Sequence, residues 1–139
     1  MSTLKAINLV HPSSANNNIV LAANGSTTVA GSIADSKGDV RDLPLNTQSS
    51  PYALVSSDAG KVVSTTANIF VASSIFTPGQ AVSVFNSSST TISIIANTNV
   101  LFRLAGQANS SNRLLAQNGV ATIICFAANN FVLSGAGLS

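Results

Sequence analysis

The amino-acid sequence predicts an all-β protein, and three observations lead to that prediction. Short runs rich in Val, Ile, Phe and Thr recur about every ten residues, with Gly, Pro, Asn and Ser turns between them. Charged residues make up 7% of the chain, far below the usual ~25%. Glu is absent, Lys and Arg are few, and Ser, Thr and Asn together form about a third of the residues, so the charged side chains on which helices commonly rely are scarce. We therefore expect a small antiparallel β-sandwich or barrel-like domain, preceded by an extended N-terminal hairpin or arm.

Residues 1–45 are predicted to form this arm. Leu4–Val10 has partial apolar alternation, and His11-Pro12 interrupts it because proline lacks an amide donor. Asn24-Gly25 between two β-prone runs is typical of a tight hairpin turn. The segment has too little apolar bulk to form its own core, so we expect it to lie on the next domain, on a neighbouring subunit or on a larger surface. The candidate attachment residues are Ile7, Leu9, His11, Pro12, Ile19, Leu21 and Val29.

A charged turn and a linker are expected after the hairpin. The Asp35–Asp42 turn holds the densest group of charges, and two interpretations apply to it. A solvated turn is favoured over a calcium loop, because the later ligands and closing Glu of an EF-hand are absent. Residues 46–51, polar and ending in Pro51, are predicted to link the arm to the main domain.

The main domain is predicted to span residues 52–139. Strands are expected at Tyr52–Ser56, Lys61–Thr65, Asn68–Val71 and Leu101–Leu104, and we expect Asp58, in a turn, to be exposed. Ala81–Phe85 and Thr90–Ile95 show clear alternation across the Asn86–Ser89 turn, which favours a hairpin.

The segment 120–134 gives the strongest hairpin signal of the domain. Two apolar runs flank Asn129-Asn130, and Asn tolerates the positive φ that a two-residue turn requires. The first run is apolar on both faces, with Ile124 and Phe126 on one side and Ile123 and Cys125 on the other. A second sheet or a second chain must cover such a strand. Ile123, Ile124 and Phe126 are thus the candidate oligomer interface, and Cys125 is expected to be a buried apolar residue.

The sequence offers little for catalysis or ligand binding. One His and one Cys are too few for a zinc site, and no phosphate-binding or nucleophile-elbow motif occurs. The six Lys and Arg residues are dispersed, which argues against a nucleic-acid partner. We find no apolar run of the ~20 residues needed to span a membrane, and residues 1–7 lack the apolar core of a secretory signal. We expect a protein that is not an enzyme and uses no cofactor or metal.

Three blocks of the sequence resemble structural proteins of tailed bacteriophages. The segment from Val40 to Lys61 is similar to one that recurs in virion proteins, particularly fibres. The same holds for the C-terminal blocks, 101–106, 113–122 and 131–139. The beginning, from Ile7 to Ala15 with Asn18–Leu21, is similar to segments in structural proteins of cyanobacterial phages. None of these blocks carries catalytic residues, so no active site follows from the resemblance.

The resemblance implies a virion protein assembled in the bacterial cytoplasm, in most such proteins as a homotrimer. A short arm leading into one β domain fits a capsid decoration protein, of the cement or head-spike type, that binds the major capsid protein or another virion protein. A short tail or neck fibre, or a fibre tip, is the alternative. A cellular carbohydrate- or lipid-binding β module is a third possibility, although one Tyr and no Trp offer little aromatic surface for sugars.

Overall fold

The computed structural model describes residues 8–139 except 32, 37, 41, 109 and 110. The chain divides into two compact units, 1–42 and 43–139. This division corrects the expected boundary. Leu45–Gln48 forms strand β6 of the second unit, so the first half of the segment predicted as a linker, residues 46–48, belongs to a sheet.

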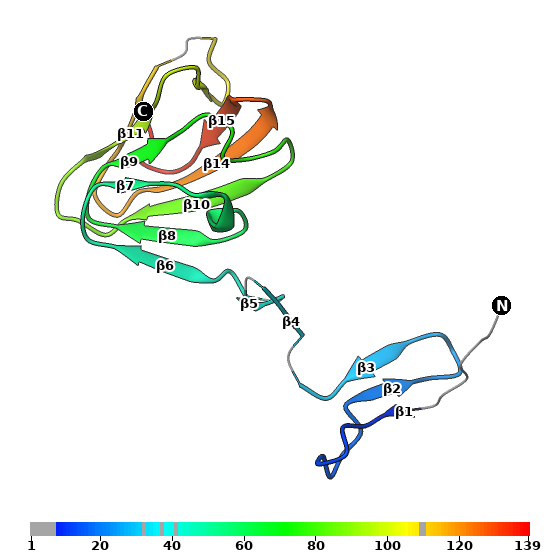
Figure 1. Ribbon diagram of the computed structural model, residues 1–139. Coiled ribbons are helices and arrows are strands. Elements are labelled where there is room, and N and C mark those ends of the chain that lie inside the picture. The colour runs from blue at the N-terminus through cyan, green and yellow to red at the C-terminus, as the bar shows by residue number, and fades with distance from the viewer. Residues whose placement is uncertain (1–7, 32, 37, 41, 109–110) are drawn as a thin grey trace. The chain divides into compact units, whose positions relative to one another are not determined.

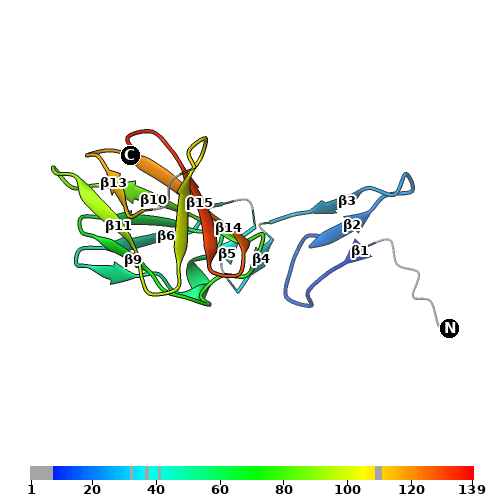
Figure 2. The ribbon, with the colours of Figure 1, turned by 90° about the horizontal axis from the view of Figure 1, so that it is seen from above.

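The first unit contains a small antiparallel sheet and a short hairpin (Figures 1 and 2). The sheet has the order β1-β2-β3, formed by Asn8–Leu9, Ile19–Leu21 and Thr27–Val29. The predicted β2–β3 turn is present and comprises Ala23, Asn24 and Gly25, with Gly25 at φ +84°. The Asn24 side-chain oxygen accepts hydrogen bonds from the backbone and the hydroxyl of Ser26, which fixes the turn. Strands β4 (Ala34–Asp35) and β5 (Gly38–Asp39) form the hairpin.

The second unit is a β-sandwich, which confirms the all-β prediction. A six-stranded sheet with the order β12-β15-β14-β10-β8-β6 faces a four-stranded sheet with the order β13-β11-β9-β7. Among the described residues the helical structure is one 3₁₀ turn, Ser56–Asp58. Besides β6, the strands are β7 (Tyr52–Ala53), β8 (Val62–Thr65), β9 (Ile69–Val71), β10 (Ala81–Asn86), β11 (Ile92–Ala96), β12 (Leu101–Leu104), β13 (Arg113–Leu115), β14 (Val120–Ala127) and β15 (Asn130–Ser134).

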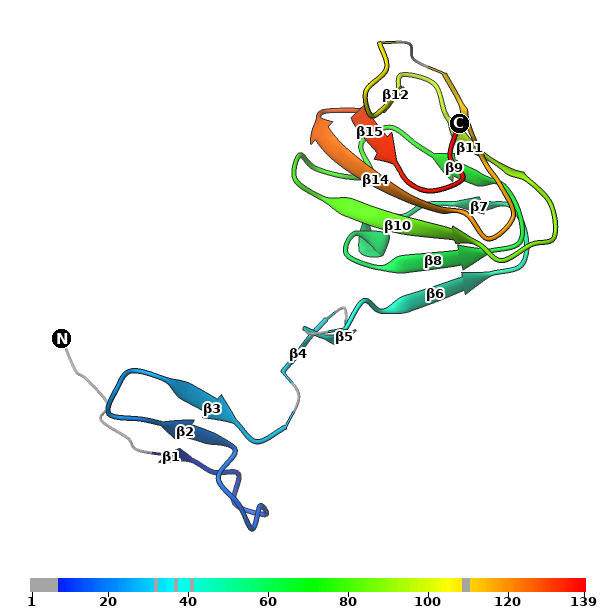
Figure 3. The same ribbon diagram turned by 180° about the vertical axis from the view of Figure 1, so that it is seen from behind.

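The first six strands of the sandwich form three stacked coils, which the sequence did not predict. Each coil has one strand in each sheet: β6 then β7, β8 then β9, β10 then β11 (Figures 1 and 3). Successive coils pair in parallel, β6 with β8 and β8 with β10 in one sheet, β7 with β9 and β9 with β11 in the other. The expectation of an antiparallel domain is therefore wrong for these six strands, which have the stacking of a short β-solenoid. It is also wrong for β12, which pairs in parallel with β15.

The predicted hairpin of residues 81–95 is the clearest error that follows from this stacking. β10 and β11 lie in different sheets, and the chain between them crosses the sandwich. Asn86 explains the crossing, because its side chain is fully buried and its amide donates to the carbonyl oxygens of Thr90, Leu115 and Ala116 at 2.8, 2.9 and 3.0 Å. Alternation correctly identified the inward face of each strand, but it does not specify the partner strand.

The first coil ends the stack with a polar inner face. Asn46 of β6 occupies the position that Val63 and Val84 fill in the next two coils. Its amide donates to Asp58 at 2.8 Å, and the Tyr52 hydroxyl donates to the same carboxylate at 2.9 Å. Asp58 is 1% exposed, so the expectation of an exposed Asp58 is wrong. At the end of the stack, a hydrogen-bonded polar side chain thus replaces the apolar inward residues of the next two coils.

The remaining strands close the other end of the stack. β14 pairs antiparallel with β10 and with β15, which confirms the hairpin of segment 120–134. Its turn lies one residue earlier than predicted, at Ala128–Asn129, with Asn129 at φ +58°. Phe131 meets Phe76 and Phe102 edge to face, with ring centroids 6.3 and 6.1 Å apart, in the core between the sheets. Cys125 is fully buried and unpaired, which agrees with its predicted role as a small apolar residue.

Candidate interaction surfaces

Four of the predicted attachment residues lie on one face of the β1–β3 sheet. Leu9 is opposite Ile19, and Ile19 is opposite Val29, so these three side chains form a row across the strands. Leu21 lies two residues after Ile19 and hence on the same face. Leu9 and Leu21 are 46% and 39% exposed, and the other two are half-buried. We call Leu9, Ile19, Leu21 and Val29 the arm face.

The other predicted attachment residues lie apart from this face. His11 and Pro12 are exposed in the connection between β1 and β2. The His11 amide donates to the Asn18 side-chain oxygen at 2.6 Å, and the His11 Nδ1 accepts from the Ser13 amide at 3.2 Å. These bonds fold the connection back so that β2 can pair with β1. Ile7 lies outside the described residues.

The candidate oligomer interface divides between core and surface. Ile123 is fully buried between the two sheets, so its assignment to an interface is wrong. Ile124 and Phe126 point to the outer face of the six-stranded sheet and are 41% and 44% exposed. The strand is apolar on both faces as predicted, but one of them is already covered by the chain's own second sheet.

A β-bulge sets the position of Phe126. Cys125 pairs with Phe131 and Ala127 pairs with Asn130, so Phe126 is the extra residue between two regular pairs. The guanidinium of Arg103, from β12, lies 5.4 Å from the centre of the Phe126 ring. Such a cation–π contact holds two long side chains together at the surface. Bulges often redirect a side chain in this way beside binding sites.

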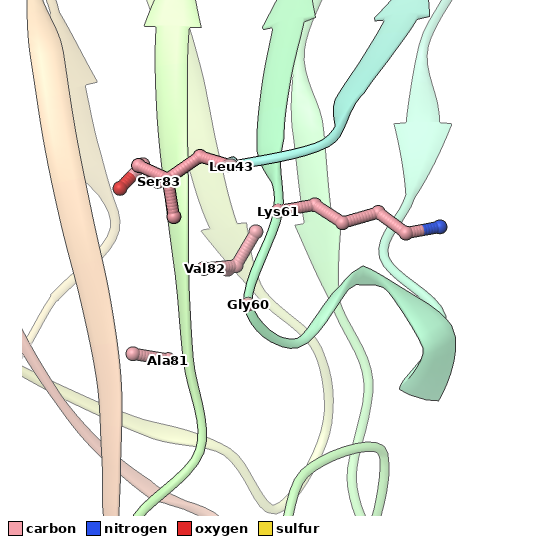
Figure 4. A pocket seen from close by; sticks show the side chains of 6 residues that line it. All are labelled: Leu43, Gly60, Lys61, Ala81, Val82 and Ser83. Carbon is pink, nitrogen blue, oxygen red and sulfur yellow. The ribbon is translucent and has the colours of Figure 1, made fainter. Parts of the chain in front are cut away.

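A shallow pocket lies beside the N-terminal ends of β8 and β10. Its volume is about 110 Å³, and it is lined by Leu43, Gly60, Lys61, Ala81, Val82 and Ser83. Figure 4 shows that the Lys61 side chain extends away from the other lining residues. Small aliphatic groups dominate the rest of the lining. This composition offers neither a set of convergent polar groups nor the volume of a typical ligand site.

The described residues hold no group of three or more metal-ligating side chains. Asp35 and Asp42 of the charged turn are exposed, whereas Lys37 and Arg41 are outside the description. Asp58 is buried, but its carboxylate oxygens accept hydrogen bonds from Asn46, Tyr52 and the Val55 amide. Burial, reinforced by the bond to Asp58, raises the pKa of the Tyr52 hydroxyl above its ordinary value. These hydrogen bonds stabilise the turn and occupy both oxygens of the Asp58 carboxylate.

No protein-family model, curated protein or solved structure matches this chain. In the part of the chain that the structure describes, no helix has the length and apolar character to cross a membrane.

Proposed function

We propose that this protein is a non-enzymatic structural protein of a tailed-phage virion, and that it decorates the outer surface of the capsid as a symmetric oligomer. The resemblance to phage virion proteins implies that this oligomer is a trimer. The observation that supports the proposal most is the contrast between the two units. The second unit encloses its own core, whereas the first presents an apolar face on a sheet of three very short strands. A sheet of that size gains stability by packing against something else.

The arm face provides the attachment in this proposal. Fully burying an aliphatic side chain contributes ~1.5–3 kcal/mol, and these side chains are already partly covered, so docking adds roughly 1 kcal/mol for each. Four such residues give about 4 kcal/mol before ordering costs are subtracted, or roughly a thousandfold in affinity. The partner is the major capsid protein or another protein of the virion.

Two adjacent residues allow a matched test of the arm face. Leu21 lies on it, whereas Val20 points to the opposite side of β2, in register with Asn8 and Thr28. Both are similarly exposed, at 39% and 36%. Replacing Leu9 and Leu21 together by Ser should weaken binding to phage heads about thirtyfold, whereas Val20→Ser should leave it nearly unchanged. Equal losses from both changes would contradict the proposed attachment.

Truncation tests whether the first unit attaches the protein to the capsid while the second unit folds independently. The fragment 43–139 retains all strands of the sandwich, including β6, and should fold by itself. The fragment should no longer bind to purified phage capsids from which the full-length protein is absent, as measured by co-sedimentation. If the fragment binds at full occupancy, the second unit is the anchor and the proposed polarity is reversed.

One feature of the structure favours the alternative, a short tail or neck fibre. Stacked coils are quasi-one-dimensional and suit an extended shaft. The two functions predict different binding sites on the particle, so labelled protein should be located by electron microscopy of phage particles. Labelling confined to the tail or neck would support the fibre.

A further inference from the structure

The outer face of the six-stranded sheet is an extended apolar surface of the second unit. Along its strands, inward residues alternate with outward ones, and the outward set includes Val62, Phe85, Val120, Ile124, Phe126 and Val132. Val120, Ile124 and Phe126 are each more than 40% exposed. Large apolar surfaces that stay exposed on a folded unit mark sites of protein contact.

The charge of this face indicates what kind of surface covers it. All six strands are described, and Arg103 is the one ionisable side chain among their outward positions. A partner of ordinary composition has about 25% charged residues, and burying their charges without counter-charges is unfavourable. This chain has ten charged residues in 139, so another copy presents a surface with few charges to desolvate.

The dimensions and the residue types also suit a protein interface. Six strands spaced ~4.8 Å apart, each of about five residues at ~3.3 Å, give a face of roughly 25 by 17 Å. This projected area, roughly 425 Å², is about half of the ~800 Å² of accessible surface that each partner buries in a standard interface, so the face can supply a small interface. Phe126 with Arg103 across its ring supplies an aromatic and an arginine, two residue types that are enriched in interface cores.

We propose that the outer face of the six-stranded sheet is the self-association surface of this protein, and that another copy of the chain covers it. Ile124 and Phe126 are its central contacts, and Arg103 holds the Phe126 ring in place. The inference rests on the oligomer of the proposed function and adds which surface forms it. It does not depend on whether the oligomer binds a phage head.

The test compares the mass of the full-length protein and three variants by light scattering at micromolar concentration. The wild type should have a multiple of the 14.0 kDa chain mass. Ile124→Lys combined with Phe126→Ser should weaken association at least ~100-fold and give the single-chain mass. Leu114→Ser is the matched control, because Leu114 is 51% exposed on the outer face of the other sheet. This control should keep the wild-type mass.

A further variant distinguishes loss of association from loss of folding. Should the double variant lose its β-sheet circular dichroism, Thr122→Lys introduces a charge at a half-buried outward position between Val120 and Ile124, and it should dissociate the oligomer. A monomeric wild type overturns the proposal, and so does an oligomer that survives both face variants. An oligomer that dissociates as expected but never binds heads overturns the capsid proposal and leaves this one standing.

Discussion

Asn86 offers the sharpest test of how the two sheets are joined. It is fully buried at the end of β10, and its amide shares two hydrogens among three carbonyl oxygens, those of Thr90, Leu115 and Ala116. Its side-chain oxygen accepts from the amide and the hydroxyl of Ser88 at 3.0 and 2.7 Å. One side chain therefore ties the crossing between the sheets to the loop that leads into β14.

The substitution Asn86→Asp keeps the shape of the side chain and removes its donors. Three carbonyl oxygens then face a negatively charged oxygen in place of an NH₂ group. Leaving buried polar groups unsatisfied costs ~1–3 kcal/mol each, and burying a charge adds to this. We expect the free energy of unfolding to fall by about 3–5 kcal/mol. For a domain of this size that corresponds to a decrease in Tm of at least ~12 °C.

Thermal unfolding followed by circular dichroism, at equal protein concentrations, measures the change. Asn97→Asp is the control, because Asn97 is exposed in the turn after β11 and the same chemical change there should alter stability by less than ~0.5 kcal/mol. If the two variants melt within a few degrees of each other, the Asn86 network does not hold the sheets together.

Two further predictions concern a close approach of two backbone segments and the alkaline pH range. At Gly135 an added Cβ would lie 1.9 Å from the Val120 carbonyl oxygen, so Gly135→Ala should lower stability by more than ~2 kcal/mol, whereas Gly31→Ala, with nothing within 4 Å, should be nearly neutral in urea unfolding. Burial raises the pKa of the Cys125 thiol, so the folded chain keeps a proton that the unfolded chain loses. The stability that this proton contributes is complete below the ordinary thiol pKa and is lost as pH rises from there to the folded pKa. The Cys125→Ala variant should therefore show a shallower decline in stability between about pH 8 and pH 10 than the wild type, and identical slopes would refute this assignment.

Local patterns in the sequence were sufficient to predict several strands of the sandwich and the inward faces of those with clear alternation, whereas β6 and β13 were not predicted. Alternation identified Val82 and Val84, and Ile92 and Ile94, as sharing faces, and all four are buried. The Asn24-Gly25 turn and the hairpin of residues 120–134 also follow from local chemistry, because only a few residue types accept positive φ. These features depend on neighbours in the sequence.

The stacking of the coils could not be predicted, because it leaves no fixed period in the sequence. From Leu45 to the paired Val62 the chain advances 17 positions, and from Val62 to the paired Ser83 it advances 21. The residues that stack also differ in kind, as Asn46 above Val63 shows. Asp58 was misjudged for a related reason, since the groups that surround it come from β6 and β7 and are brought together only by the fold.

The candidate interaction surfaces were predicted in part. The residues of the arm face were chosen for being apolar in a segment without a core, and the register then placed four of them on one side. For Ile123 the same reasoning was wrong, because an apolar strand does not reveal which of its faces the chain itself covers. Arg103 was missed, since its contact with Phe126 joins strands that are distant in the sequence.

The number of copies of this protein per phage particle tests the central proposal most directly. Quantitative mass spectrometry of purified particles, from a phage whose genome encodes this chain, gives its ratio to the major capsid protein. A capsid decoration protein should be present in hundreds of copies, in a fixed ratio to the capsid subunits. A dozen copies would contradict capsid decoration in favour of a fibre, and absence from the particle would contradict a virion role altogether.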